Sequence, residues 1–241
     1  MKVIIIAGGL GTRISEETDD KPKPMVLING QPILWHLMNI FSLQGFNDFV
    51  ISTGYKSEVI EKWVGKNMIL DSNFEKINIH TLNTGLQTQT GGRISEVMKI
   101  LPNERVIATY GDGLANVSIE KLLDFHTRHG KFATVTAVRP PARFGYMKIE
   151  ENTVTHFGEK NQSDEGWING GFFVLEPQVA NYVKSLDEPF ESGALVRLAE
   201  ESNLMAYHHE SFWQPMDTLR EKRELEKDAL LDIPPWLNFK T

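Results

Sequence analysis

Apolar and polar residues follow two distinct rhythms along the first half of the chain. Short apolar runs rich in β-branched residues, typical of buried strands, occur at 3–6, 49–52, 77–82, 106–109 and 133–137. Stretches with apolar residues at helical spacing lie between them, at 33–43, 58–64, 94–100 and 119–129. Strands that alternate with helices predict an α/β fold, with a Rossmann-like, mostly parallel sheet flanked by helices on both faces.

The rhythm loosens after about residue 140. Short strands are expected at 146–149, 154–157 and 172–175, and helices at 179–186 and 194–202. No repeat, linker or low-complexity tract separates the two halves, so we expect a single domain, 1–241. In it, residues from about 141 to 230 form a second half that closes over the sheet of residues 1–140. The tail, 232–241, looks irregular, and its Trp236 is interpreted as either a core residue or a subunit contact.

The first apolar run leads directly into a glycine-rich segment. Ala-Gly-Gly-Leu-Gly-Thr-Arg stands at 7–13, and Lys-Pro-Lys-Pro follows at 21–24. Glycines let backbone N–H groups approach an anion closely, and the guanidinium of Arg13 matches phosphate oxygens two at a time. The compact ammonium of Lys23 suits a single oxygen whose negative charge grows during a reaction. These features predict a triphosphate site.

Two familiar phosphate-binding motifs do not fit this segment. A Walker loop has Gly-Lys-Ser or Gly-Lys-Thr after its last glycine, whereas Thr12 and Arg13 follow Gly11. A dinucleotide fingerprint has a third glycine near position 14, which is Ile14, and an acidic residue at the end of the next strand, where 49–54 has none. Dehydrogenase chemistry is therefore disfavoured.

Composition narrows the class of partner. The 241 residues include 25 basic and 32 acidic side chains, a formal charge of -7, so no nucleic-acid partner is expected. The absence of cysteine excludes disulfides, thiolate metal sites and cysteine nucleophiles. No apolar run approaches the length of about 18 residues that a membrane span needs, and the run at 3–7 is too short for a signal peptide. We expect a cytoplasmic protein, with no membrane partner, whose local cations serve a small anion.

Two aspartates are candidate metal ligands. Asp112 follows an expected strand in the phrase Tyr-Gly-Asp-Gly, at the edge of the sheet where ligands gather in parallel α/β folds. Asp217 follows a short apolar run that contains Pro215. Mg²⁺ takes one or two carboxylates and completes its shell with water and phosphate oxygens. The alternative for Asp217 is a helix N-cap, because a helical pattern begins at Thr218 and Leu219.

Several motifs together carry a family resemblance. They are Ala-Gly-Gly-Leu-Gly-Thr-Arg (7–13), Lys-Pro-Lys-Pro-Met (21–25), Thr-Gly-Gly-Arg (90–93), Tyr-Gly-Asp-Gly (110–113), Arg-Phe-Gly (143–145), Glu-Lys (159–160), Asn-Gly-Gly-Phe-Phe-Val (169–174) and Phe-Trp-Gln-Pro-Met-Asp-Thr (212–218). In this order, they closely resemble those of the sugar-1-phosphate nucleotidyltransferases, and most of all the glucose-1-phosphate cytidylyltransferases among them. The resemblance implies nucleotide-sugar biosynthesis, in which an acceptor phosphate oxygen attacks the α-phosphorus of CTP in line and pyrophosphate leaves.

The resemblance also implies roles for individual residues. Residues 1–140 become the nucleotide-binding half and 141–230 the acceptor-binding half. Arg13 takes the leaving pyrophosphate, Lys23 neutralises the α-phosphate, and Asp112 and Asp217 hold Mg²⁺. The nucleotide-binding set is Ala7, Gly8, Gly9, Gly11, Thr12, Arg13, Thr88, Gly92, Arg93 and Gly111. The acceptor-binding set is Tyr146, Glu159, Lys160, Asn169 and Gly170, with Lys160 on the acceptor phosphate.

Arg93 bears on the choice of base. Cytosine presents acceptors at O2 and N3, whereas uracil presents a donor at N3, and arginine can only donate. An arginine at the pyrimidine edge therefore favours CTP. The alternative from the residues alone is that Arg93 caps or pairs with the helix that begins near Ile94.

Three alternatives stay open. The same chemistry could use UTP or dTTP, and a non-catalytic nucleotide-binding protein could keep the fold. The acceptor could be another hexose phosphate or a different small phosphorylated metabolite, because the segment between Val64 and Thr88 is shorter than in typical glucose-1-phosphate cytidylyltransferases. In addition, Asn161 follows Lys160 where that family usually has proline. We expect a homo-oligomer.

Overall fold

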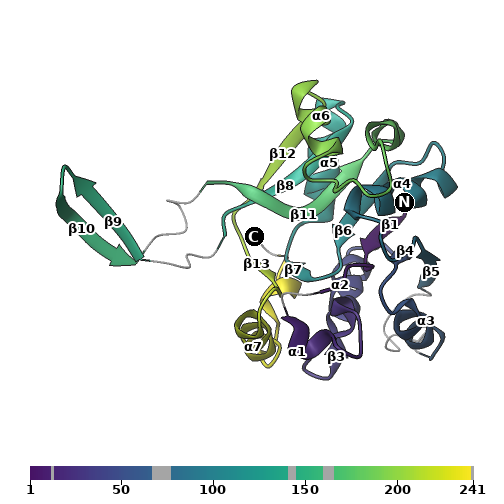
Figure 1. Ribbon diagram of the computed structural model, residues 1–241, viewed down its shortest axis with the longest axis horizontal. Coiled ribbons are helices and arrows are strands. Elements are labelled where there is room, and N and C mark those ends of the chain that lie inside the picture. The colour runs from purple at the N-terminus through teal and green to yellow at the C-terminus, as the bar shows by residue number, and fades with distance from the viewer. Residues whose placement is uncertain (12–13, 67–76, 141–144, 160–165, 240–241) are drawn as a thin grey trace.

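The computed structural model describes residues 1–11, 14–66, 77–140, 145–159 and 166–239. Within these residues, seven strands form one sheet in the order β12-β8-β11-β6-β1-β4-β5 (Figure 1). β1 pairs in parallel with both β4 and β6, β4 with β5, and β12 with β8. The predicted α/β fold with a mostly parallel sheet is confirmed.

The bounds of the elements follow the expected rhythm in the first half. The strands are β1 (Val3–Ile6), β2 (Leu27–Ile28), β3 (Gln31–Pro32), β4 (Asp48–Thr53), β5 (Asn78–Asn83), β6 (Val106–Tyr110), β7 (Gly113–Ala115), β8 (Ala133–Val138), β9 (Gly145–Glu150), β10 (Thr153–Glu159), β11 (Ile168–Leu175), β12 (Leu204–His209) and β13 (Trp213–Pro215). The α-helices are α1 (Ser15–Thr18), α2 (Ile33–Ser42), α3 (Ser57–Lys66), α4 (Thr90–Ile100), α5 (Ile119–His129), α6 (Ala194–Glu200) and α7 (Leu219–Asp228), and the 3₁₀ helices are η2 (Lys23–Met25), η4 (Pro177–Tyr182) and η5 (Pro235–Leu237).

The core lies in two layers, one on each face of the sheet. Side chains alternate across a strand, so Val3 and Ile5 of β1 pack with α2, α3 and α5, whereas Ile4 and Ile6 pack with α4 and α6. All four β1 side chains are buried. This double cover explains why β1 is a continuous apolar run rather than an alternating one.

β11 is the antiparallel strand of the large sheet. It pairs in antiparallel register with β6 on one side and β8 on the other, with Ile168 opposite Val138 and Phe172 opposite Thr109. Its beginning therefore lies at the edge where the parallel strands end. The two-stranded β9–β10 hairpin precedes it in sequence and stands apart from the sheet (Figure 1).

One expectation for the second half was wrong, and one strand was missed. Residues 179–186 do not form an α-helix, because the 3₁₀ helix η4 ends at Tyr182 and an extended Val183 follows it. β12 was not predicted, although it adds an edge strand parallel to β8. The residues of β12 alternate only weakly between buried and exposed positions. The strand also ends in His208 and His209, a residue type that does not favour strands.

The C-terminal tail packs onto the body of the domain. Trp236 is fully buried, and its ring lies 5.5 Å from that of His36 and 6.0 Å from that of Phe212. Of the two interpretations of Trp236, the core residue is confirmed. No helix among the described residues has the length and apolar character needed to cross a membrane.

Two histidines, His126 buried and His129 half-buried, lie at the opposite edge of the sheet from the ligand edge. Lys131 N–H donates to Nδ1 of His129 at 2.9 Å, so Nε2–H of His129 donates to Oγ1 of Thr134 at 2.7 Å. The Thr134 hydroxyl then donates to Nδ1 of His126 at 2.8 Å, and Nε2–H of His126 donates to Glu176 at 3.2 Å. His129 must be neutral, because its Nδ1 accepts from Lys131 N–H, and a neutral His126 lets the Thr134 hydroxyl donate its own proton. Burial lowers the pKa of His126 and of His129 in agreement with that assignment.

We expect the free energy of unfolding to decrease as the pH falls through the folded-state pKa values of His126 and His129. A histidine whose folded pKa lies below its unfolded value, about 6.5, stabilises the fold fully above that value and ceases to do so as it is protonated. Thermal melts between pH 7.5 and 5 should show a falling Tm, and His126→Gln should show a shallower fall. An equal slope in both proteins would contradict the assignment.

Candidate active site

A cavity of about 760 Å³ opens at the edge where β1, β6 and β8 end and β11 begins. Its walls include residues from both halves of the chain: Ala7, Gly9, Gly11, Lys23, Thr88, Thr90, Arg93, Tyr110, Gly111, Asp112, Asn169, Gly170, Gly171, Glu191, Trp213 and Asp217. Parallel α/β sheets bind ligands at this edge. The cavity therefore contains most of the described residues that the sequence nominated.

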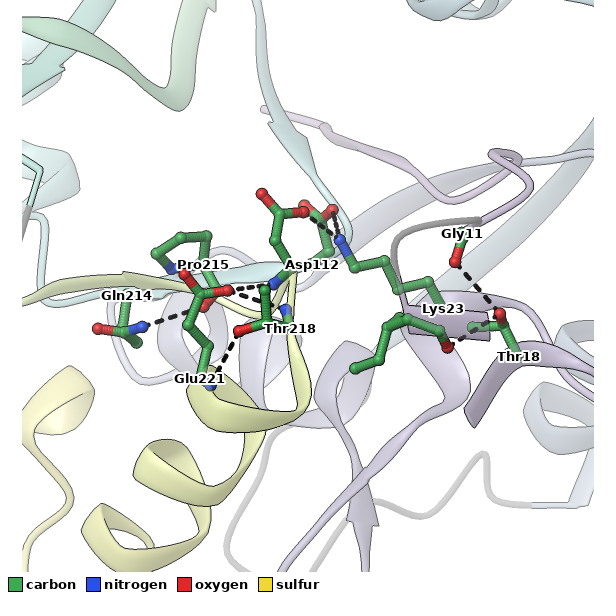
Figure 2. Close-up of polar contacts among 10 residues, drawn as sticks. Gly11, Thr18, Lys23, Asp112, Gln214, Pro215, Thr218 and Glu221 are labelled. Atoms are coloured by element: carbon green, nitrogen blue, oxygen red, sulfur yellow. Dashed lines mark hydrogen bonds and ion pairs between the residues drawn. The ribbon is translucent and has the colours of Figure 1, made fainter. Parts of the chain in front are cut away.

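Lys23 bridges the two candidate metal ligands. Its Nζ lies 2.7 Å from Oδ2 of Asp112 and 2.6 Å from Oδ1 of Asp217, and only 10% of the lysine side chain is exposed (Figure 2). The two aspartates come from positions 112 and 217, far apart in sequence, yet both meet one ammonium group. The structure thus brings Lys23, Asp112 and Asp217 together, while the catalytic and metal-binding roles inferred for them from the sequence stay predictions.

Opposing effects act on the Lys23 ammonium. Burial alone would lower its pKa, but the ion pairs and hydrogen bonds with Asp112 and Asp217 outweigh burial and hold the pKa above its ordinary value. Lys23 is therefore positively charged at neutral pH. It is a fixed cation in the cavity lining.

A short antiparallel pair of strands brings the two aspartates together. β7 begins directly after Asp112 and pairs with β13, with Gly113 opposite Pro215. The N–H of Met216 also donates to the carbonyl of Asp112 at 2.8 Å. Because Asp217 follows Met216 directly, this ladder fixes the distance between the two carboxylates through the backbone.

The N-cap of α7 is Thr218, not Asp217. The Thr218 hydroxyl accepts the N–H of Glu221 at 3.2 Å, and Oε2 of Glu221 accepts the N–H of Thr218 at 2.9 Å and of Asp217 at 2.7 Å (Figure 2). This is a capping box extended by one residue. The alternative interpretation of Asp217 as a helix cap is wrong, and its carboxylate faces Lys23 instead.

The glycine-rich turn is shaped by close contacts. Gly11 has φ +66°, a left-handed conformation that favours glycine, and its carbonyl accepts a hydrogen bond from the Thr18 hydroxyl at 3.2 Å (Figure 2). A Cβ on Gly8 would lie 2.1 Å from the guanidinium of Arg93. The turn therefore depends on both glycines, one for its backbone angle and one for the space that Arg93 fills.

Arg93 connects three elements beneath this turn. It lies within α4 rather than before it, is 2% exposed, and donates to the carbonyls of Gly8 at 2.9 Å and Thr53 at 2.8 Å. It also donates to the Thr84 hydroxyl at 2.7 Å. Burial lowers its pKa, and among the described residues no carboxylate lies within ion-pair distance. A buried cation that meets only neutral acceptors has the capacity to bind acceptor atoms of a ligand in the cavity.

The other nominated residues fall into three groups. Ala7, Gly9, Gly11, Thr88, Gly111, Asn169 and Gly170 line the cavity. Gly8 and Gly92 are not in its lining: Gly8 lies against Arg93, and a Cβ on Gly92 would lie 2.2 Å from the Leu186 carbonyl oxygen, so packing explains both glycines. The roles of Thr12, Arg13 and Lys160 stay predictions, because these residues lie outside the described part of the chain, and so do those of Tyr146 and Glu159, which lie on the β9–β10 hairpin.

Several cavity residues were not nominated from the sequence, among them Tyr110, Glu191 and Trp213. Trp213 donates its Nε1–H to the Gly170 carbonyl at 2.8 Å, while Tyr110 and Glu191 share a hydrogen bond through the Tyr110 hydroxyl. Tyr110 and Trp213 stood inside the quoted motifs, next to residues that received roles. Glu191 had no such signal, because it lies in a loop before α6.

The mostly parallel sheet, with a buried lysine and an acidic pair at its carboxyl edge, defines a nucleotide-processing α/β enzyme. The chain belongs to the nucleotidyl transferase family, whose family model matches residues 2–218. It is therefore a nucleotidyltransferase.

Relatives of known name match nearly the whole chain. Glucose-1-phosphate cytidylyltransferase from Salmonella typhi is 44% identical, with 98% of both chains covered. A probable glucose-1-phosphate cytidylyltransferase from Bacillus subtilis (strain 168) is 40% identical and covers 94% of this chain and 95% of its own. Among solved structures, HddC from Yersinia pseudotuberculosis, complexed with GMP-PN, superposes with a TM-score of 0.72 at 25% identity and covers 95% of this chain and 99% of its own.

Proposed function

We propose that this protein is a Mg²⁺-dependent cytidylyltransferase that joins CTP to glucose 1-phosphate, giving CDP-glucose and pyrophosphate. The observation that carries the proposal is the convergence of Lys23, Asp112 and Asp217 in a cavity that Arg93 and the glycine turn also line. The full-length similarity to glucose-1-phosphate cytidylyltransferases at 40% and 44% identity supports the choice of substrates.

The reaction is an in-line displacement at the α-phosphorus of CTP. A phosphate oxygen of glucose 1-phosphate forms the new P–O bond, and the bond to the bridging oxygen of the β-phosphate breaks, so that pyrophosphate leaves with the electron pair. Such reactions need positioning and charge neutralisation more than covalent chemistry. Lys23, positively charged at neutral pH and part of the cavity lining, neutralises the negative charge that grows on the α-phosphate.

The acidic pair fits a magnesium ion. Both carboxylates offer the hard oxygen ligands that Mg²⁺ prefers, and both converge on the Lys23 ammonium, so an ion held between them would replace that contact. No group of three or more metal-binding side chains occurs among the described residues, and Mg²⁺ that binds with a nucleotide needs only one or two. Held by Asp112 and Asp217, the ion would supply charge neutralisation at the phosphate oxygens. The homo-oligomeric state and the cytoplasmic location stay predictions.

The Arg93 guanidinium supports the choice of CTP. Cytosine O2 and N3 both accept hydrogen bonds, whereas N3–H of uracil would face another donor. We therefore expect kcat/KM for CTP to exceed that for UTP by roughly tenfold to a hundredfold, the effect of leaving buried groups unpaired at about 1–3 kcal/mol. The measurement is pyrophosphate release with each ribonucleoside triphosphate and dTTP, against a panel of phosphorylated acceptors.

The Arg93→Ala variant distinguishes recognition of the base from a purely structural role, in which Arg93 holds the backbone of Gly8 and Thr53. If Arg93 reads the base, the variant should use CTP less well and also prefer it less. If it only holds Gly8 and Thr53 in place, both nucleotides should lose activity equally and Tm should fall. Arg105→Ala is the control, because Arg105 lies in an ion pair with Glu176 at the far edge of the sheet. Equal use of CTP and UTP by the unchanged enzyme would contradict the proposal.

A further inference from the structure

A directed chain of hydrogen bonds joins several residues of the cavity lining. Gly171 N–H donates to Oδ1 of Asn169 at 2.8 Å, and Nδ2 of Asn169 donates to the Tyr110 hydroxyl oxygen at 3.1 Å. The Tyr110 hydroxyl then donates to Oε1 of Glu191. The Thr90 hydroxyl donates to Oε2 of the same carboxylate at 2.7 Å.

The members of this chain are held from outside it. The Thr90 hydroxyl accepts the N–H of Phe190 at 2.8 Å, which fixes its proton toward Glu191. The Tyr110 ring rests on Gly171, where a Cβ would lie 2.6 Å from the ring. Burial, together with the nearby Glu191, raises the pKa of Tyr110, so its hydroxyl remains a donor at neutral pH.

The lone pairs of Glu191 and the N–H of Asn169 that remain after these contacts indicate which chemical groups of a ligand the two side chains can bind. A carboxylate has about four lone-pair sites, so each Glu191 oxygen keeps one after accepting from Tyr110 or Thr90. Asn169 keeps one N–H. Acceptor sites on a carboxylate next to an amide donor match hydroxyl groups, which donate and accept, and they repel a phosphate.

We propose that Glu191 is a further specificity-determining residue, which binds ring hydroxyls of the acceptor beside Asn169, the residue already expected to bind the acceptor, and that Tyr110 positions the Glu191 carboxylate. The inference rests on the proposed function, because it names how the acceptor of that reaction is recognised. It also orients the acceptor: the ring hydroxyls face Glu191, and the phosphate faces Lys23 and the α-phosphate of the nucleotide.

The main test compares Glu191→Gln with the unchanged enzyme. The amide removes the negative charge and one acceptor oxygen, so KM for glucose 1-phosphate should rise about tenfold to a hundredfold, while KM for CTP stays within about twofold. Deoxy analogues of glucose 1-phosphate identify the hydroxyl: the analogue that lacks it should be a poor substrate for the unchanged enzyme and lose little more with Glu191→Gln. Tyr110→Phe should raise the same KM by a smaller factor and leave the CTP value unchanged.

The chain offers a matched control outside the cavity. The Tyr182 hydroxyl donates to Glu201, which repeats the tyrosine–glutamate pair near α6 without access to the cavity lining. Glu201→Gln and Tyr182→Phe should leave both KM values unchanged. The inference is overturned if Glu191→Gln behaves like Glu201→Gln, or if it raises KM for CTP as much as KM for the acceptor.

Binding measured without turnover separates this inference from the proposed function. Calorimetric titration with glucose 1-phosphate should show weaker binding to Glu191→Gln than to the unchanged protein. If CTP is not turned over but this loss of binding is seen, the proposed reaction fails and the role of Glu191 stands. If the unchanged protein binds neither glucose 1-phosphate nor another hexose phosphate, the role of Glu191 is wrong.

Discussion

Asp217→Asn is expected to abolish Mg²⁺-dependent turnover while the fold remains intact, and Asp112→Asn should do the same. Each change replaces a carboxylate with an amide of nearly equal shape, so packing is preserved while the charge that attracts a divalent cation is lost. Removal of one preorganised electrostatic contact typically lowers the rate by about 10²–10³-fold. Pyrophosphate release across a range of Mg²⁺ concentrations measures the loss, and high Mg²⁺ should rescue either variant in part.

Asp228→Asn is the control for this experiment, because Asp228 ends the same helix, α7, far from its N-cap. It should keep the rate and the metal dependence of the unchanged enzyme. The metal-site assignment would be refuted if Asp217→Asn retained normal activity and metal dependence and only melted at a lower temperature. That outcome would instead describe a purely structural residue beside the cap.

Lys23→Ala should lower kcat by about 10²–10³-fold and change KM for CTP far less. The lysine charge is needed most in the transition state, where negative charge grows on the α-phosphate, and less in the ground-state complex. The change also leaves Asp112 and Asp217 without the ammonium that they share, so the variant should melt at a lower temperature. Steady-state kinetics with varied CTP separate the two constants, and a thermal melt follows stability.

Lys21→Ala is the matched control for Lys23→Ala. Lys21 belongs to the same Lys-Pro-Lys-Pro sequence, but its charge lies near Asp20, at 3.5 Å, and outside the cavity lining. It should leave kcat unchanged. A Lys23→Ala variant within threefold of the unchanged enzyme would show that the charge has no catalytic role.

The sequence predicted the first half of the fold because its strands are buried on both faces and its helices have a clear apolar side. The signal in β1 and α2 is local, since the residues of one element determine its periodicity. β12 was missed because its formation depends on pairing with β8, which is distant in sequence, and the helix predicted at 179–186 is a 3₁₀ helix that ends at Tyr182. A short stretch of sequence does not show with which distant strand it will pair.

The candidate site was predicted from motifs, and the prediction fails where a contact depends on residues distant in sequence. Lys23, Asp112 and Asp217, all nominated from motifs, lie in contact, and their roles stay predictions. The sequence did not distinguish Asp217 from the N-cap Thr218, which is the next residue. Arg93 was nominated for the base, whereas its contacts with Gly8 and Thr53 depend on tertiary structure. Glu191 was not nominated, because a lone glutamate in a loop has no pattern.

The antiparallel direction of β11 has a consequence for how this fold can vary. Since Ile168 pairs with Val138, the connection between β8 and β11 leaves the sheet and returns to it at one place, beside the cavity. Residues can be inserted or deleted there without any shift in strand register. The connection is thus a modular segment, whose length can change while the sheet stays the same. The β9–β10 hairpin is the module that this chain carries at that point.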